Sequence, residues 1–163
     1  MNMYFTTVDS PIGTLTLSGT EQALTGLYFS SGSKAKGPDP AWQSADAPFA
    51  RAREQLQEYF AGDRKTFELN LAPRGTDFQL SVLNALLEIP YGETRSYRDI
   101  AEQIGNVKAV RAVGAANGNN PIALIIPCHR VIGSNGSLTG FGGGLDTKRF
   151  LLEHELGRSG LFA

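Results

Sequence analysis

The fold of this 163-residue chain turns on the segment IALIIPCHRV at residues 122–131. The aliphatic side chains at 124–126 predict a short strand that is buried on both faces. Pro127 follows, and because proline has no backbone N–H it ends the hydrogen-bond ladder of a strand. The sequence therefore predicts a rigid buried element whose end presents the residues that come next.

Cys128, His129 and Arg130 stand at the end of that predicted strand. They are a soft nucleophile, a titratable imidazole and a fixed cation. Neighbouring side chains on a strand point to opposite faces, so Cys128 and His129 act together only if the chain bends or a water molecule bridges them. A single cysteine after an apolar run is also common as a small packed hydrophobe. The segment alone leaves both interpretations open.

Length and composition indicate an ordinary globular protein. With 163 residues, 41% of them hydrophobic, the chain can form one domain or two small ones that share an interface. We recognise no signal peptide and no membrane-spanning run, and therefore expect a cytoplasmic location. One cysteine rules out an intramolecular disulfide, and with only His129 and His154 beside it we expect no metal and no cofactor.

Charge is unevenly distributed, although the net charge is only −1. Residues 94–149 contain seven Lys/Arg against three Asp/Glu, whereas residues 1–70 contain six against eight. This asymmetry suggests a basic functional face on the C-terminal half. Charge alone gives DNA binding little support, because solvated surfaces often carry such an excess.

The first half of the chain predicts a strand-rich α/β domain at residues 1–71. MYFTTVD, TLTLSG and ALTGLYFS alternate with a period of two and are separated by turn residues, which predicts an antiparallel β-meander. A polar loop at 31–46 follows, and then a helix capped by Asp46 and ended by Gly62. Residues 67–71 predict one more strand, and 72–75 a linker. The apolar residues of the helix are Phe49, Leu56, Tyr59 and Phe60.

The second half, residues 76–160, predicts a mainly helical domain. Thr76 is placed to cap a helix that stops at 89–90, and Ser96 with Asp99 three residues later forms a capping-box pattern for the next one. A third helix is predicted at 107–117, and these last two have the outline of a helix-turn-helix. The final helix is expected at 145–156, after a glycine-rich loop.

The third helix is rich in small residues, including Ala112, Gly114 and Ala115. Small side chains let the helix backbone lie very close to whatever it faces. A core partner and a DNA groove both satisfy that pattern.

Several motifs, taken in order, resemble the O6-alkylguanine-DNA alkyltransferase family, the methylated-DNA–protein-cysteine methyltransferases. They are YGETRSY at 91–97, AVRAVG at 109–114, Asn120-Pro121, IPCHRV at 126–131, and GGL at 143–145 with Lys148, Leu151-Leu152 and His154-Glu155. The resemblance covers nearly all of residues 76–155 and implies an α/β (α+β) fold, with a small strand-rich N-terminal domain before a helical C-terminal domain.

The resemblance implies that Cys128 accepts an alkyl group from O6-alkylguanine, with O4-alkylthymine as a second candidate substrate. An unperturbed thiol has a pKa of about 8.5, so the site must favour the thiolate. By the family pattern His129 does so through a bridging water, and Glu155 holds the imidazole in the useful tautomer. Asn120 would brace the turn before the active-site segment. Because a thioether is not removed, each chain would act once.

The resemblance also assigns the binding residues. Tyr97 would donate a hydrogen bond to the guanine ring, and the backbone near Val131 would read its exocyclic amine. The target base must be flipped out of the duplex. Arg111 would enter the stack in its place while the small-residue helix lies in the minor groove. The residues predicted to bind DNA are Arg111, Ala112, Gly114, Ala115 and Arg130.

Phe141 and Gly142 depart from the family pattern, since many relatives carry Tyr-Ser there. The backbone N–H of Gly142 would have to replace the missing hydroxyl, and the glycine would also allow a roomier pocket.

We expect a monomer that binds double-stranded DNA and no membrane. Two alternative functions are a non-enzymatic lesion sensor and a Cys-His hydrolase. Cys128 argues against a lesion sensor, since such sensors typically have Trp at this position. The adjacent Cys-His pair gives poor geometry for a hydrolase.

Overall fold

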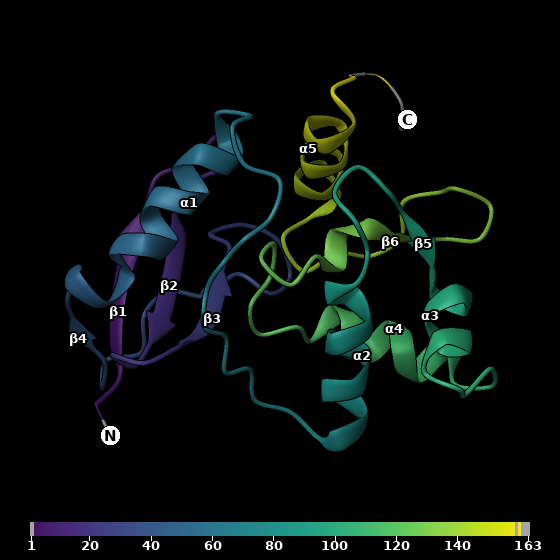
Figure 1. The fold of residues 1–163 in the computed structure, drawn as a ribbon, viewed down its shortest axis with the longest axis horizontal. Helices are drawn as coiled ribbons and strands as arrows, with labels where there is room; N and C mark the ends of the chain where they lie inside the picture. The colour runs from purple at the N-terminus through teal and green to yellow at the C-terminus, as the bar shows by residue number, and fades with distance from the viewer. Residues whose placement is uncertain (1, 159, 161–163) are drawn as a thin grey trace.

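The computed structural model describes residues 2–158 and 160 and has two parts, joined along one side (Figure 1). A small sheet with one helix forms the N-terminal part, and most of the remaining helices form the C-terminal part. Met1 and Ser159, which belong to the predicted domains 1–71 and 76–160, lie outside the described residues. The observed mixture of sheet and helix agrees with the predicted α/β (α+β) class.

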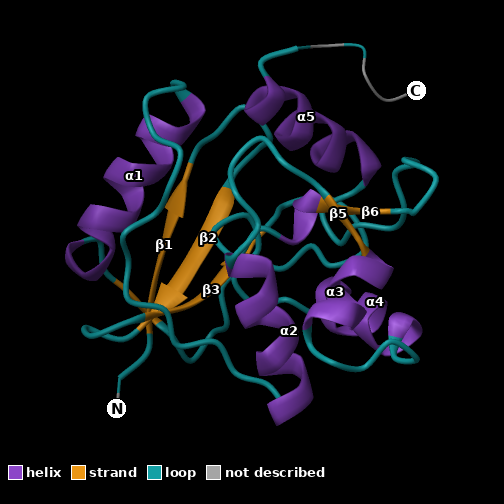
Figure 2. Ribbon diagram, turned by 45° about the vertical axis from the view of Figure 1, so that its right-hand side comes forward, coloured by secondary structure: helices purple, strands orange, loops and turns teal. Residues whose placement is uncertain are grey.

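The N-terminal sheet contains the predicted meander. β1 (Tyr4–Val8), β2 (Leu15–Gly19) and β3 (Leu24–Tyr28) pair antiparallel, and the short β4 (Gln43–Ser44) joins β1 in parallel, which gives the order β3-β2-β1-β4. A 3-10 turn, η1 (Ala47–Phe49), leads into α1 (Ala50–Phe60), which lies beside the sheet (Figure 2). Leu56 and Tyr59 point from α1 into the core and are fully buried.

Two details of this part differ from the sequence predictions. Asp46 does not cap the helix, because its carboxylate accepts hydrogen bonds from Thr6 and Arg53 instead. Residues 67–71 do not form a strand. Only Leu71 bridges Leu24, since the segment meets β3 at its end and otherwise runs along the junction of the two parts.

In the C-terminal part, the N-termini of two helices were predicted correctly. α2 (Asp77–Leu87) begins with a capping box between Thr76 and Gln79, and α3 (Tyr97–Gln103) with one between Ser96 and Asp99. α4 (Val110–Gly118) packs on both, and it starts three residues later than predicted because residues 106–109 form a turn. β5 (Arg95–Ser96) pairs in parallel with β6 (Val131–Ile132), and α5 (Leu145–Leu156) closes the chain.

The prediction of a strand at 124–126 is wrong. The segment is buried, but it folds into a tight turn in which Leu124 has a φ of +71° and Ile126 N donates to Ile122 O. Because the chain reverses here, it leaves the turn at Pro127 and enters a second 3-10 turn, η2 (Cys128–Arg130). This bend removes the alternation that would have separated Cys128 from His129.

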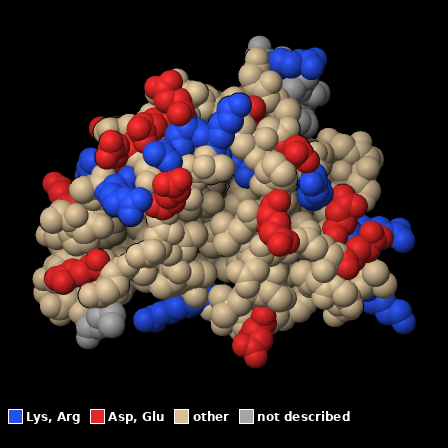
Figure 3. Space-filling view, viewed as in Figure 1, with Lys and Arg blue, Asp and Glu red and all other residues tan. Residues whose placement is uncertain are grey.

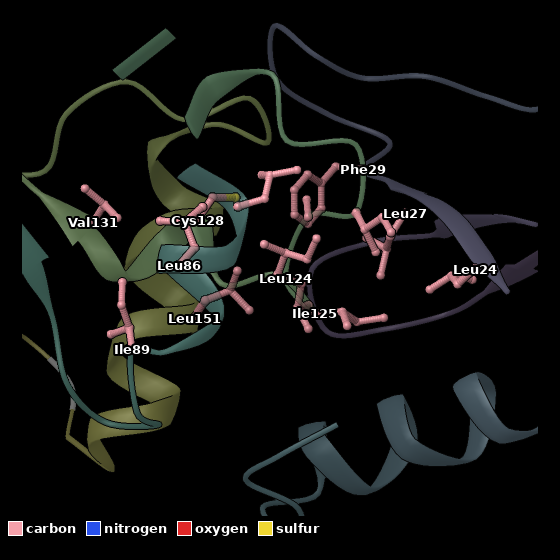
Figure 4. Close-up of a cluster of buried hydrophobic side chains, with 14 of the residues drawn as sticks. Leu24, Leu27, Phe29, Leu86, Ile89, Leu124, Ile125, Cys128, Val131 and Leu151 are labelled. Atoms are coloured by element: carbon pink, nitrogen blue, oxygen red, sulfur yellow. The ribbon is translucent and has the colours of Figure 1, made fainter. Parts of the chain in front are cut away.

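The turn also joins the cores of the two parts. Figure 4 shows Leu24, Leu27 and Phe29 of the sheet side, Leu124 and Ile125 of the turn, and Leu86 and Leu151 of the helices in one continuous apolar cluster. Cys128 lies within this cluster. The segment with the thiol is therefore held from both sides.

Candidate active site

Cys128 is almost completely buried on η2 and borders a small cavity of about 40 Å³. The cavity lies between the two parts, since Phe29 and Lys34 line it from one side and Asn120 and Phe141 from the other. Burial raises the pKa of the thiol, and the amide of Asn120 and the nearby charge of Lys148 oppose that effect. The thiol is therefore protonated in this environment, and forming a thiolate requires a nearby proton acceptor.

His129 is fully buried beside the thiol residue and is oriented by Glu155. Its Nε2 lies 2.8 Å from Glu155 Oε2, as the sequence interpretation anticipated, while Nδ1 has no hydrogen-bond partner in the part of the chain that the structure describes. Burial lowers the pKa of the imidazole, against the opposing effect of Glu155. The ring is thus neutral, with its hydrogen on Nε2, and Nδ1 is a free acceptor.

Glu155 is the centre of a buried hydrogen-bond network. Its Oε1 accepts from Arg130 Nε at 2.7 Å, and its Oε2 accepts from His129, from Arg130 Nη2 at 3.0 Å and from the hydroxyl of Tyr59 at 2.7 Å. Burial acts to raise the pKa of this carboxyl, but the His129 and Arg130 interactions outweigh it and hold the pKa far below its usual range. Glu155 is therefore a carboxylate at neutral pH.

The prediction that Arg130 contacts DNA is wrong. Its guanidinium is turned inward, with Nε and Nη2 on Glu155 and Nη1 on the carbonyl of Ile89 at 2.7 Å. Only 7% of the residue is exposed. Arg130 therefore neutralises Glu155 and ties η2 to the segment after α2, and its burial keeps the guanidinium away from a phosphate at the surface.

Lys148 is a buried cation near the thiol, and the sequence analysis listed it in the family motif without giving it a role. Its Nζ donates to Val131 O at 2.6 Å and is 3.4 Å from Thr139 O, so it links β6 to the glycine-rich loop. Burial lowers its pKa to about 8, and the proximity of Cys128 partly opposes the shift. A pattern in the sequence could have revealed it, since residues 148, 151, 152 and 155 have the i, i+3, i+4, i+7 spacing of a buried helix face.

Two asparagines fix the backbone around the site. Asn120 donates from Nδ2 to Ile126 O at 2.8 Å and accepts at Oδ1 from Ile122 N at 3.0 Å, so it spans the turn that precedes Cys128. Asn117, which the sequence analysis missed, is buried on α4 and donates to Cys128 O at 3.3 Å. Asn117 therefore ties η2 to α4, and Asn120 fixes the turn from which η2 starts.

Tyr97 and Val131 both lie next to Lys148 Nζ. The Tyr97 hydroxyl is 2.6 Å from Thr139 Oγ1, and a Cβ added at Gly114 would be in ordinary van der Waals contact with the Tyr97 ring, at 3.9 Å. Val131 is buried, and its carbonyl already accepts from Lys148. Any contact of that carbonyl with a base must therefore share the oxygen with Lys148 Nζ.

Gly142 does not enlarge the cavity, contrary to the interpretation of its missing side chain. A Cβ at this position would lie 2.6 Å from Lys34 Cγ and 2.7 Å from Lys34 Cβ, so the stem of Lys34 fills the space. The carbonyl of Gly142 also accepts from Lys34 N at 2.9 Å, and Lys34 Nζ reaches Asn119 Oδ1 at 3.1 Å. The N-terminal part thus supplies one wall of the cavity.

α4 presents one face to the core and another to solvent. Val113 and Ala116 are buried, whereas Arg111, Ala112 and Ala115 are exposed. The two interpretations of the small-residue helix therefore apply to opposite faces of it. Basic side chains are interspersed with acidic ones over the face in Figure 3, without a continuous patch of one sign.

These features define a two-part α/β protein with a buried Cys-His-Glu site. Residues 3–73 match the family model for the 6-O-methylguanine DNA methyltransferase ribonuclease-like domain, and residues 77–157 match that for the DNA-binding domain. The chain belongs to the 6-O-methylguanine DNA methyltransferase family, which confirms the resemblance found in the sequence.

Relatives match over nearly the whole chain. A Methanosarcina acetivorans protein named methylated-DNA–protein-cysteine methyltransferase is 54% identical over 153 residues, covering 94% of this chain and 98% of the relative. A Mycobacterium tuberculosis protein of the same name is 52% identical over 160 residues, covering 96% and 94%. The crystal structure of Mycobacterium tuberculosis OGT in complex with DNA superposes with a TM-score of 0.90 at 53% identity, covering 95% and 94%.

Proposed function

We propose that this protein repairs alkylated DNA by direct reversal, moving the alkyl group from O6 of guanine to Sγ of Cys128. The observation that carries the proposal is the buried thiol followed by an imidazole whose Nδ1 is unpaired and whose Nε2 is held by a carboxylate. Relatives with more than half of their residues in common are named as transferases of this kind.

The chemistry requires the thiol proton to leave as the sulfur attacks. His129 Nδ1 takes that proton, through a bridging water, and Glu155 stabilises the resulting imidazolium. Sulfur then bonds to the alkyl carbon, the bond from that carbon to O6 breaks, and its electron pair passes to the base. Guanine takes up one proton, which balances the one lost by Cys128.

Lys148 assists the transfer in two ways. Its charge favours the thiolate of Cys128, and its bonds to the carbonyls of Val131 and Thr139 hold the loop over the base. The product is a thioether, which none of these residues can cleave. Each chain therefore acts once.

DNA is the proposed partner, as a double strand that carries O6-alkylguanine. The solvent face of α4 would enter the minor groove, with Ala112 and Ala115 allowing close approach and Arg111 replacing the flipped base. At Gly114, α4 lies beside Tyr97, whose hydroxyl would leave Thr139 to bond the guanine ring.

Several further points stay predictions. They are a monomeric state, a cytoplasmic location, domain boundaries at 1–71 and 76–160, the Gly142 N–H and Phe141 as base contacts, and O4-alkylthymine as a second substrate. The part of the chain that the structure describes has no helix both long and apolar enough to cross a membrane.

The DNA product tests the proposal. A duplex with one O6-methylguanine is incubated with increasing amounts of protein and then digested to nucleosides. We expect the lesion to disappear in proportion to the protein added, one per chain, with guanine appearing in its place. Cys128→Ser serves as the control and should leave the lesion intact. Excision of the base, or turnover of many lesions per chain, would contradict the proposal.

A further inference from the structure

Tyr59 connects the N-terminal part of the molecule to the Cys-His-Glu site. It lies in α1 and is fully buried, and its hydroxyl donates to Glu155 Oε2 at 2.7 Å across 96 residues of sequence. Burial and the neighbouring carboxylate raise the pKa of the phenol far above its usual range. The hydroxyl therefore keeps its hydrogen and always acts as a donor to Glu155.

The position of Tyr59 is fixed at both ends. Its backbone carbonyl accepts from His154 Nε2 at 2.7 Å, and its ring packs edge-on against Phe60 and Tyr91. The same turn of α5 thus carries His154, which holds the backbone of Tyr59, and Glu155, which receives its hydroxyl. A hydroxyl held this firmly restricts the rotation of the Glu155 carboxylate.

The hydroxyl bonds the same oxygen that orients the imidazole. Oε2 of Glu155 receives three donors, namely Tyr59, His129 and Arg130 Nη2, so the three share its negative charge. A donor removed from this oxygen leaves more charge for the others. The hydroxyl of Tyr59 therefore influences how strongly Glu155 favours a protonated His129.

We propose that Tyr59 is a positioning residue of the site: through Glu155 Oε2 it sets the orientation and proton affinity of His129, so the N-terminal part contributes directly to alkyl transfer. The inference rests on the proposed function as far as the transfer step is concerned. It gives α1 a chemical role in addition to packing.

Other charged and titratable groups also face this network. They are Cys128 and Arg130 on η2, Lys148 and His154 on α5, and Tyr91 before β5. All of these belong to the C-terminal part, and among the described residues Tyr59 alone donates to Glu155 from the N-terminal part. Substituting it leaves the other groups in place, so a change in the His129 titration reports the lost hydroxyl.

Tyr59→Phe tests the inference, with Phe60→Leu as the matched control. Phe60 packs on Phe150, on His154 and on the ring of Tyr59, so Phe60→Leu loosens the packing around Tyr59 while the Tyr59 hydroxyl is kept. The first measurement is the NMR titration of the His129 ring, which needs no DNA and is simple to assign because the chain has two histidines. The second is the single-turnover methyl-transfer rate against pH, normalised to active protein.

In Tyr59→Phe we expect the His129 pKa and the acid limb of the rate profile to move up by about half a unit to one unit, the scale of one hydrogen bond. The plateau rate should fall about threefold to tenfold, because the carboxylate is less well fixed. Phe60→Leu should lower stability and leave both pH-dependent quantities unchanged. Fluorination of the Tyr59 ring, which strengthens the donor, should shift them in the opposite direction.

An unchanged His129 titration in a folded Tyr59→Phe protein would overturn the inference, as would an equal shift in Phe60→Leu. The proposed function fails separately, if the wild-type protein transfers no methyl group. In that case a shifted titration would still establish Tyr59 as the residue that controls the imidazole.

Discussion

Replacing Glu155 by glutamine should destabilise the protein strongly, because it removes the charge on which the buried network depends. The carboxylate accepts four hydrogen bonds, at 2.7, 2.7, 2.8 and 3.0 Å, and its side chain is 1% exposed. An amide of the same shape presents an NH₂ group to at least one of those donors. It also leaves the buried guanidinium of Arg130 without a counter-charge.

Breaking a buried ion pair by removing one partner costs about 3–5 kcal/mol. For a domain of this size, 1 kcal/mol corresponds to about 2–4 °C, so we expect the melting temperature of Glu155→Gln to fall by roughly 10 °C at pH 7. The matched control is Glu102→Gln, which removes an exposed pair with Arg98 on α3 and should cost at most about 0.5 kcal/mol.

The dependence of the unfolding free energy on pH in the acid range tests the role of Glu155 independently. The folded-state pKa of Glu155 is far below its unfolded value, so its contribution is present above the unfolded pKa of about 4.3 and is lost as the pH falls toward the folded pKa. The difference in unfolding free energy between wild type and Glu155→Gln, measured by urea titration, should shrink as the pH falls below 4. A cost under 1 kcal/mol at pH 7, or a difference independent of pH, would show that the Glu155 charge does not stabilise the buried network.

Three further substitutions test other contacts. Lys148 has a folded-state pKa of about 8, below the ordinary 10.5, so between these pH values the unfolded chain binds more protons than the folded protein. The free energy of unfolding should therefore rise from pH 8 to 10.5. Lys148→Met should flatten that rise in urea titrations, and an unchanged slope would count against burial of the ammonium. Gly142→Ser should cost about 1–3 kcal/mol through collision with Lys34 Cβ and Cγ. A second change, Lys34→Gly, removes both atoms and should restore part of that loss, whereas additive losses would show that the two residues do not meet. Arg111→Ala should weaken binding to lesion-bearing duplex about tenfold in gel-shift titrations, against little effect of Arg98→Ala, and equal losses would disprove a special role for Arg111.

Local sequence patterns predicted the elements whose causes are local. The cap at Thr76 and the capping box of Ser96 and Asp99 were recognisable because these side chains satisfy free N–H groups of their own helix turn, and the structure adds Gln79 as the partner of Thr76. The meander followed in the same way from alternation and turn residues. The Cys-His-Glu set was named from the family resemblance, and the structure brings these residues together.

The sequence predictions were wrong where contacts between residues distant in the sequence determine the local structure. Aliphatic residues at 122–126 are equally compatible with a strand and with a buried turn, and the amide of Asn120 closes the turn. Arg130 was assigned to DNA because nothing local shows that Glu155, 25 residues on, would turn it inward. The hydrogen bond from Tyr59 joins residues 96 apart and leaves no pattern in the sequence at all.

The most direct test of the central claim examines the protein itself after the reaction. Intact-mass spectrometry of the chain mixed with an excess of O6-methylguanine duplex, followed by peptide mapping, locates any group that the protein has acquired. We expect the mass of one methyl group on every chain, carried by Cys128 and absent from Cys128→Ala. Unmodified protein that still binds the lesion tightly would contradict it and would indicate a lesion sensor instead.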